Sequence, residues 1–220
     1  MFGIPGQTME DFSQDLEESL ANDPNHLSLY GLEIHPGTTF FHDQQIREMQ
    51  SERSELEREL YLQALHKTAS MSLIQYEVSN FAKADFQSRS NLKVWDGQPY
   101  LGLGCGAHSF DGVNRWGNVR SMRKYMESVG REELPRDFME TPTRLQQASE
   151  RLMISLRRPE GLNILSWQEE FQIGLTLEQK NQMEKLKDQD LVSWESPFLK
   201  LTTEGMLLAD AITAELMPEA

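Results

Sequence analysis

The sequence predicts an α/β fold made of two successive parts. The first part is a strand–helix–strand unit, with a tight turn at residues 2–8, an amphipathic helix after it and an apolar strand at 26–34. The second part is a group of helices beginning near residue 140 and ending in a small strand pair. Because a helix that connects two strands of one sheet usually leaves them parallel, we expect a parallel sheet in the first part.

The first helix has clear start and stop residues. Thr8 is the expected N-cap, and Asp11 three residues later approximates a capping box. Apolar residues then recur every four positions, at Phe12, Leu16 and Leu20, before Pro24 prevents continuation. A long amphipathic helix is expected at 43–70 and a third strand at 74–78. The core face of the long helix should comprise Leu56, Leu60, Ala64 and either Tyr61 or Leu65.

Residues 79–118 are rich in Gly, Asn, Ser and aromatic residues without a sustained period, which predicts an extended loop region. Helical spacing resumes after Pro135, first at Leu145, Ala148, Leu152 and Leu156, and further helices are expected at about 163–171 and 176–188. A strand pair at 191–201 and a closing helix at 203–216 complete a helical domain that resembles a winged helix. The predicted domains are therefore 1–135 and 140–220.

Composition excludes several classes of function. The 220 residues carry a formal charge of −14, and residues 141–220 contain 8 basic and 13 acidic residues, a net −5. Such a balance disfavours nucleic acid as a partner, because that binding depends on neutralising phosphates. The sequence shows neither a run of about 18 apolar residues nor a secretory leader at its start. We expect a cytoplasmic protein without a membrane span.

Cysteine content limits the redox chemistry of these residues. Cys105 is the one cysteine, so an intramolecular disulfide and a four-iron cluster held by three or four thiolates are both excluded for this chain alone. The five histidines show no paired metal-ligand spacing. The string GLGCGA at 102–107 formally matches a dinucleotide fingerprint, but no apolar strand precedes it and no helix start follows it. We therefore reject a Rossmann interpretation.

Four strings carry a family resemblance, in the family's order: FGIPGQT at 2–8, LYGLEIHPGT at 29–38, YEVSNFA at 76–82 and YLGLGCGAHS at 100–109. The segments LMISLR at 152–157 and LTTEGMLL at 201–208 extend it. The chain resembles the C-terminal portion of the radical S-adenosylmethionine (SAM) oxygen-independent coproporphyrinogen III oxidase-like family, HemN and HemW. This resemblance implies a partial radical SAM (TIM-like) parallel barrel over 1–135 and a HemN C-terminal, winged-helix-like domain over 140–220.

The resemblance also implies cofactors. The family uses a 4Fe–4S cluster and SAM, and its cluster is held by a Cys-x-x-x-Cys-x-x-Cys loop that these residues do not contain. By itself the chain is therefore expected to be inert as an enzyme. Glu33 and His108 match places where SAM lies against the family's backbone, so they are the candidate SAM contacts. The alternative is that Glu33 merely begins a loop and that His108 is a hydrogen-bonded turn histidine.

Haem is the third implied cofactor. HemW-type members carry a haem-associated His-Asn-x-x-Tyr-Trp string, and this chain has SNLKVW at 90–95. Asn91 and Trp95 are retained and are the candidate haem contacts, whereas Ser90 replaces the imidazole and Val94 replaces the phenol. Trp95 could stack on a porphyrin, or it could instead anchor its own segment to the core.

The function implied is that of the C-terminal part of a radical SAM protein of porphyrin metabolism, nearer to HemW-type haem chaperones than to the oxidase. The amino-acid sequences at Pro36–Gly37–Thr38 and at 76–82 favour that branch. The alternative is a stand-alone protein- or porphyrin-binding module without catalysis. Expected partners are a tetrapyrrole or a haem-accepting protein, and an exposed barrel edge could mediate association.

Overall fold

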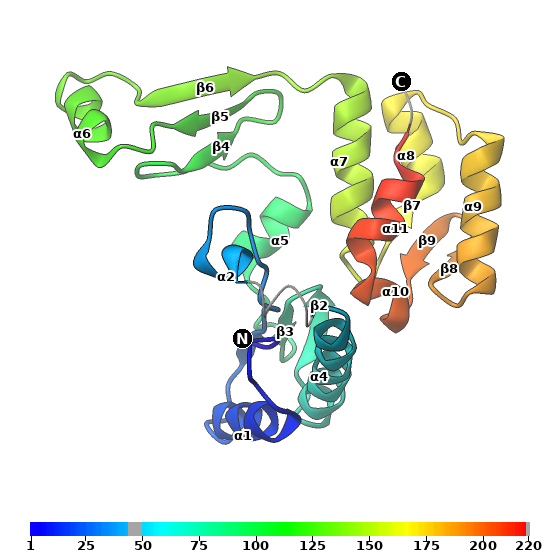
Figure 1. The fold of residues 1–220 in the computed structure, drawn as a ribbon. Coiled ribbons are helices and arrows are strands. Elements are labelled where there is room, and N and C mark those ends of the chain that lie inside the picture. Colours follow the sequence, from blue (N-terminus) through cyan, green and yellow to red (C-terminus); the bar gives the residue numbers. More distant parts are fainter. Residues whose placement is uncertain (44–49, 219–220) are drawn as a thin grey trace. The chain divides into compact units, whose positions relative to one another are not determined.

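The computed structural model describes residues 1–43 and 50–218. The chain divides into two compact units, Met1–Gln87 and Ser88–Ala220, and each has its own core. Figure 1 shows their elements.

The helices of the first unit follow the apolar spacing of the sequence. Helix α1 (Met9–Leu20) begins at Thr8, whose side chain caps the helix in a reciprocal capping box with Asp11. Its buried residues are Phe12, Leu16 and Leu20, as predicted. Helix α2 (Thr39–His42) was not foreseen. Helix α4 (Gln50–Ser70) buries Leu60, Tyr61 and Ala64, so Tyr61 rather than Leu65 completes its core face. The part of the predicted helix at 44–49 lies outside the described residues.

The sheet of the first unit corrects the expected parallel arrangement. Its strands are β1 (His26–Ser28), β2 (Ile74–Glu77) and β3 (Asn80–Ala82), in the order β1-β3-β2 with both pairings antiparallel. The predicted third strand does not pair with the second, because the chain turns back after Glu77 and places β3 between them. Within the part of the first unit that the structure describes, parallel pairing is confined to a bridge between Phe2 and Gly31. The partial barrel remains a prediction.

The core of the first unit forms where the two long helices meet the sheet. The ring of Phe2 lies 6.1 Å from that of Phe12 on α1 and 6.2 Å from that of Tyr61 on α4, measured between centroids. Phe81 on β3 is fully buried. The turn at the start of the chain therefore contributes an aromatic side chain to the core.

The second unit begins with regular structure where the sequence predicted an extended loop. It contains a helix, a three-stranded antiparallel sheet in the order β4-β5-β6 and a helix at one end of that sheet (Figure 1). These elements are α5 (Arg89–Trp95), β4 (His108–Phe110), β5 (Arg115–Asn118), α6 (Met122–Gly130) and β6 (Arg136–Glu140). The loop prediction for 79–118 is wrong because strands of three or four residues are too short to show a period.

The remainder of the second unit contains the predicted helices and strand pair. They are α7 (Arg144–Leu156), β7 (Leu162–Asn163), α8 (Ile164–Phe171), α9 (Leu177–Asp188), β8 (Val192–Glu195), β9 (Phe198–Leu201), α10 (Thr203–Leu207) and α11 (Ala209–Leu216). The single closing helix expected at 203–216 is two helices that meet at Leu208. The sheet β7-β9-β8 is antiparallel. Its description as a winged helix stays a prediction.

Few strong contacts connect the two halves of the second unit. Arg115 on β5 forms an ion pair with Glu150 on α7 at 2.8 Å, and Arg158 pairs with Asp96 at 2.5 Å. These side chains are 20–44% exposed, and exposed ion pairs contribute about 0–1 kcal/mol each. The apolar core of α7 to α11 instead involves residues of the C-terminal half, among them Leu152, Trp167 and Leu199.

A glycine substitution tests the packing of this core. A Cβ at Gly205 on α10 would overlap the carbonyl oxygen of Leu191. We expect Gly205→Ala to lower the free energy of unfolding by about 1–3 kcal/mol or more, because the backbone must move. Gly174, where a Cβ would meet no atom within 4 Å, provides the control. Urea denaturation of both variants measures the difference, and equal midpoints would contradict the packing described.

We propose that residues 140–220 fold by themselves, because their core is local and the ion pairs to the preceding half are partly exposed to solvent. A fragment of these residues should show helical circular dichroism and one cooperative thermal transition. Leu152→Ala, which removes a buried side chain, should lower the stability of the fragment by about 2–5 kcal/mol. A fragment with a random-coil spectrum would show that the predicted boundary at 135–140 is wrong.

Candidate functional site

The candidate SAM residue of the first unit lies just beyond the parallel bridge. Glu33 lies two residues after Gly31, and its side chain is 80% exposed. The Oε2 atom of Glu33 lies 3.2 Å from Nε2 of His35. The structure thus presents Glu33 and His35 together on an exposed segment. The role of Glu33 as a SAM contact stays a prediction.

The candidate SAM residue of the second unit belongs to a strand rather than to a turn. His108 on β4 pairs with Gly117 on β5, which pairs with Phe138 on β6, so the three residues form one row across the sheet. The rings of His108 and Phe138 contact each other edge to face, with centroids 5.4 Å apart. Gly117 permits this contact, because a Cβ there would overlap the Phe138 ring. The turn alternative for His108 is therefore wrong.

The glycine-rich loop before β4 is held by side chains from three directions. The backbone N–H of Gly102 donates to Oγ of the buried Ser109 at 2.9 Å, and that of Gly104 donates to the hydroxyl of Tyr125 at 3.1 Å. The Asn118 amide donates to the carbonyl oxygens of Gly102 and Gly104, at 3.3 and 2.9 Å. The loop leads into strand β4 and not into a helix, which confirms the rejection of a dinucleotide site.

The haem-associated positions lie on α5 and divide between its two faces. Asn91 and Trp95, one turn apart, are half-buried. Ser90 and Val94, also one turn apart, are exposed. The two residues that this chain retains thus contact the protein, whereas the two that it has lost would point to solvent.

A buried polar network in the first unit was not foreseen from the sequence. Glu77 is 1% exposed and accepts hydrogen bonds from the Asn80 side-chain amide and from the Ser79 backbone N–H. The carbonyl oxygen of the Asn80 side chain accepts from Oγ of Ser28 at 2.5 Å. Nearby, Nε2 of His26 lies 2.7 Å from the hydroxyl oxygen of Tyr76. Apart from Ser79, which lies in the turn between β2 and β3, these residues lie on the three paired strands.

Burial alters the proton affinity of two groups at this network. Desolvation raises the pKa of Glu77, although the hydrogen bonds from Asn80 and Ser79 and the nearby His26 oppose the rise. Desolvation also raises the pKa of Tyr61 to about 12, with a smaller contribution in the same direction from Glu77. The Tyr61 hydroxyl accepts from the Gln75 amide at 2.5 Å. A buried carboxyl of raised pKa is typical of functional sites but also of structural networks. The YEVSNFA string was the feature of the sequence that could have located it.

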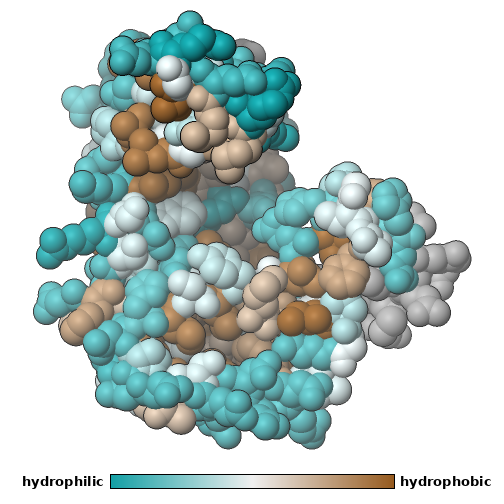
Figure 2. All heavy atoms as spheres, turned by 90° about the vertical axis from the view of Figure 1, so that its left-hand side faces the viewer, coloured by the Kyte–Doolittle hydropathy of each residue, from teal (hydrophilic) through white to brown (hydrophobic). Residues whose placement is uncertain are grey.

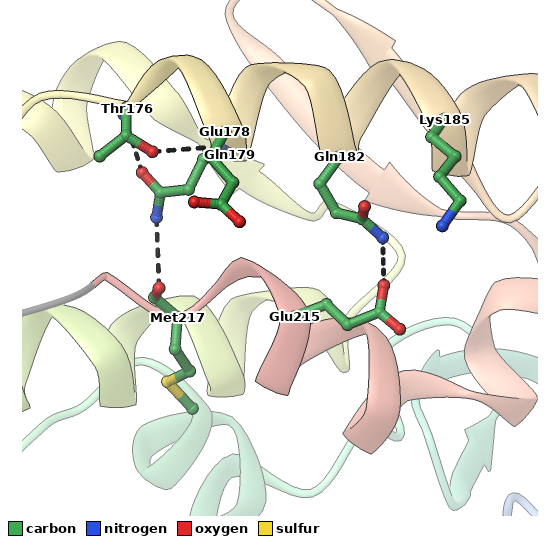
Figure 3. A pocket seen from close by; sticks show the side chains of 7 residues that line it. All are labelled: Thr176, Glu178, Gln179, Gln182, Lys185, Glu215 and Met217. Atoms are coloured by element: carbon green, nitrogen blue, oxygen red, sulfur yellow. Dashed lines mark hydrogen bonds between the residues drawn. The ribbon is translucent and has the colours of Figure 1, made fainter.

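A polar pocket of about 290 Å³ lies between α9 and α11. Figure 3 shows the side chains that line it, with Gln179 facing the backbone of Met217 and Gln182 facing Glu215. The Gln179 amide donates to the carbonyl oxygens of Leu216 at 3.0 Å and Met217 at 3.4 Å. These polar groups hold the end of α11 against α9.

The described residues contain no group of three or more His, Cys, Asp or Glu side chains arranged to hold a metal ion. Cys105 is half-buried and free. Nor does any described helix combine the length and apolarity needed to cross a membrane.

Comparison with solved structures defines the class of fold. The structure reported as "Coproporphyrinogen III oxidase (HemN) from Escherichia coli is a Radical SAM enzyme" superposes with a TM-score of 0.72 at 16% sequence identity. The match covers 96% of this chain and 52% of that one. The chain therefore has the fold of part of a radical SAM enzyme of the coproporphyrinogen oxidase type.

Sequence comparison points to a more particular group. Heme chaperone HemW of Bacillus subtilis (strain 168) is 30% identical over all of this chain and 58% of its own length. HemW of Lactococcus lactis is 25% identical over 96% of this chain and 55% of its own length. The mitochondrial radical S-adenosyl methionine domain-containing protein 1 of Danio rerio is 29% identical over all of this chain. No family model matches.

Along its whole length the chain is therefore similar to proteins of the HemN/HemW-like family, and its fold agrees with this similarity. The chain spans between half and three fifths of the length of the curated relatives that it matches.

The buried carboxyl gives a prediction on pH. Because the folded pKa of Glu77 lies above the ordinary value of 4.5, the folded state holds this proton more tightly than the unfolded chain. Its contribution to stability is full below that value and is lost as the pH rises through the folded pKa. We expect the free energy of unfolding of the wild type, relative to that of Glu77→Gln, to fall as the pH rises above 4.5.

Denaturant unfolding across a pH series measures this difference. The exposed Glu178→Gln serves as the control for removing one carboxyl elsewhere on the protein. A constant offset between Glu77→Gln and the wild type is compatible with the prediction, since glutamine changes the hydrogen bonds at all pH values. A wild-type curve parallel to that of Glu77→Gln would show that Glu77 titrates normally.

Proposed function

We propose that this chain takes part in handling haem or a related tetrapyrrole, as the C-terminal part of a HemW-type haem chaperone. The observation that carries this proposal is the match along the entire chain to heme chaperone HemW of Bacillus subtilis. Since the chain spans 58% of that relative, the activity of the whole protein is part of the proposal. A haem-accepting protein is the partner that such a function requires.

The HemW branch is favoured over the oxidase by the sequence at 76–82, and in the structure this hairpin carries buried polar side chains. The hairpin at 76–82 contains Tyr76, Glu77 and Asn80, whose side chains form the polar network of the first unit. The amino-acid sequence of this hairpin, together with Pro36–Gly37–Thr38, was the basis for choosing that branch. The sequence relatives agree with the choice, because the first of them are haem chaperones.

The residues present fit radical chemistry and haem differently. One cysteine cannot hold a 4Fe–4S cluster, so we derive no radical step from these residues. Glu33 and His108 remain our proposed SAM contacts. For haem, Trp95 and Asn91 on α5 offer a half-buried aromatic and an amide. The adjacent exposed face, with Ser90 and Val94, supplies neither an imidazole nor a phenol. Any haem bound here is therefore held by stacking and apolar contact.

Haem titration tests this proposal. We expect Ser90→His to strengthen haem binding by about 10-fold and to sharpen the Soret band, because a bond from imidazole to iron adds a directional contact. Position 90 suits the substitution, since it is exposed and lies in the first turn of α5. Absorbance on these samples reports iron ligation. Because the chain has four tryptophans, the difference in fluorescence quenching between each sample and its Trp95→Phe counterpart reports proximity to Trp95.

Two variants separate this outcome from its rivals. Ser166→His, also an exposed serine in the first turn of a helix, should leave haem binding unchanged. His108→Ala should also have no effect, because its ring contacts Phe138 within the sheet. If His108→Ala abolishes the Soret band while Ser90→His changes nothing, the ligand is His108 and the proposed site on α5 is wrong. Absence of haem binding by all variants would defeat the proposed function itself.

A further inference from the structure

Helix α6 presents its apolar side to solvent. Met122, Met126 and Val129 recur at i, i+4 and i+7, so they form one stripe along the helix, and they are 64%, 60% and 47% exposed. We call these three residues the α6 stripe. No residue of α6 is buried. Figure 2, viewed from the side on which α6 lies in Figure 1, shows apolar side chains gathered in its upper part.

Contacts beside the stripe hold α6 in place. The hydroxyl of Tyr125 accepts a hydrogen bond from the backbone of Gly104 at 3.1 Å. The side chain of Ser121 caps the first turn, and the backbone N–H of Glu133 donates to the carbonyl oxygen of Ser128 at 2.9 Å. The position of the helix thus depends on groups outside the stripe. Packing against the described residues therefore does not account for the apolar side chains of the stripe.

The segment around the stripe is slightly basic in an acidic protein. Residues 111–133 contain five basic and four acidic residues, a net +1, whereas the whole chain carries −14. Arg123 pairs with Glu127 and Arg131 with Glu133. Among the described residues, Arg120 and Lys124 have no carboxylate partner, and both are exposed. A partner with carboxylates would complement them.

The placement of these charges does not serve the helix itself. Arg123 and Lys124 lie in the first turn of α6, which contains no acidic residue. The macrodipole of a helix makes positive side chains unfavourable at its N-terminus. The dipole and these two cations therefore add to the same positive potential beside the α6 stripe, and this potential attracts an acidic ligand.

We propose that the α6 stripe and its basic rim dock an acidic amphipathic helix of another protein. Nine helical residues extend about 13 Å at 1.5 Å per residue, which suits one helix packed alongside. Methionines adapt to varied apolar partners and are frequent on protein-binding surfaces. Helices that lie on membranes instead present Trp, Phe or Leu, which the stripe lacks. A protein partner is therefore favoured over an anionic lipid surface.

The test uses the full 220-residue chain and a labelled synthetic peptide with leucine on one helix face and glutamate on its flanks. We expect fluorescence anisotropy to show binding that weakens with salt. Met122→Ser combined with Met126→Ser should weaken it by about 10-fold, since it removes the apolar anchors. Arg120→Glu combined with Lys124→Glu should weaken it by a similar factor and reduce the salt dependence.

Matched variants on α9 control for nonspecific effects. Leu177→Ser removes an apolar side chain that is 74% exposed, and Lys180→Glu combined with Lys187→Glu reverses two exposed charges. Neither change should alter binding. Equal binding of a peptide with lysine in place of glutamate would overturn the proposal, as would equal losses in the α9 variants or no binding of the acidic peptide. Binding of phosphatidylglycerol vesicles without binding of the peptide would identify a lipid surface instead and would also overturn it. None of these outcomes depends on haem titration, so the proposed function is tested separately.

Discussion

The first unit depends on one row of polar side chains that crosses three strands. Ser28 on β1, Asn80 on β3 and Glu77 on β2 are register partners, and the Asn80 amide bonds to both neighbours through its oxygen and its nitrogen. A slip of β3 by one residue would turn Asn80 to the other face. The buried Glu77 would then lose its amide donor, at a cost of about 1–3 kcal/mol or more for such a group. The register of the sheet is therefore fixed by hydrogen bonding as much as by apolar packing.

This row also explains why the sheet differs from the parallel arrangement that the sequence indicates. A helix between two strands favours parallel neighbours, and β1 and β2 do run in the same direction, since both are antiparallel to β3. The returning strand β3 separates them. Its residues were assigned to a loop because Asn80 is polar and because three residues show no alternation. Asn80 is a buried strand residue because its side chain bonds to Glu77 and to Ser28, and Ser28 lies 52 positions away in sequence.

Helices were predictable for the opposite reason. Their apolar spacing and caps are local, and Thr8, Thr143 and Thr176 each begin a helix with a capping box. The candidate site residues likewise combine features that the sequence could predict with features that it could not. The family strings located Glu33, His108, Asn91 and Trp95 in the sequence, yet the surroundings of each were not predictable. His108 contacts Phe138 because Gly117 has no side chain between them, and this contact depends on pairing that spans 30 residues.

The division of α5 into two faces has a consequence for how such a protein can diverge. Asn91 and Trp95 are half-buried, so their replacement would disturb the attachment of the helix, whereas Ser90 and Val94 are exposed and bear little on folding. If haem binds on α5 as proposed, selection acts on the exposed pair through haem binding alone, and on the half-buried pair also through stability. An iron ligand at an exposed position of this helix would then be lost or exchanged in a single step while the fold is retained.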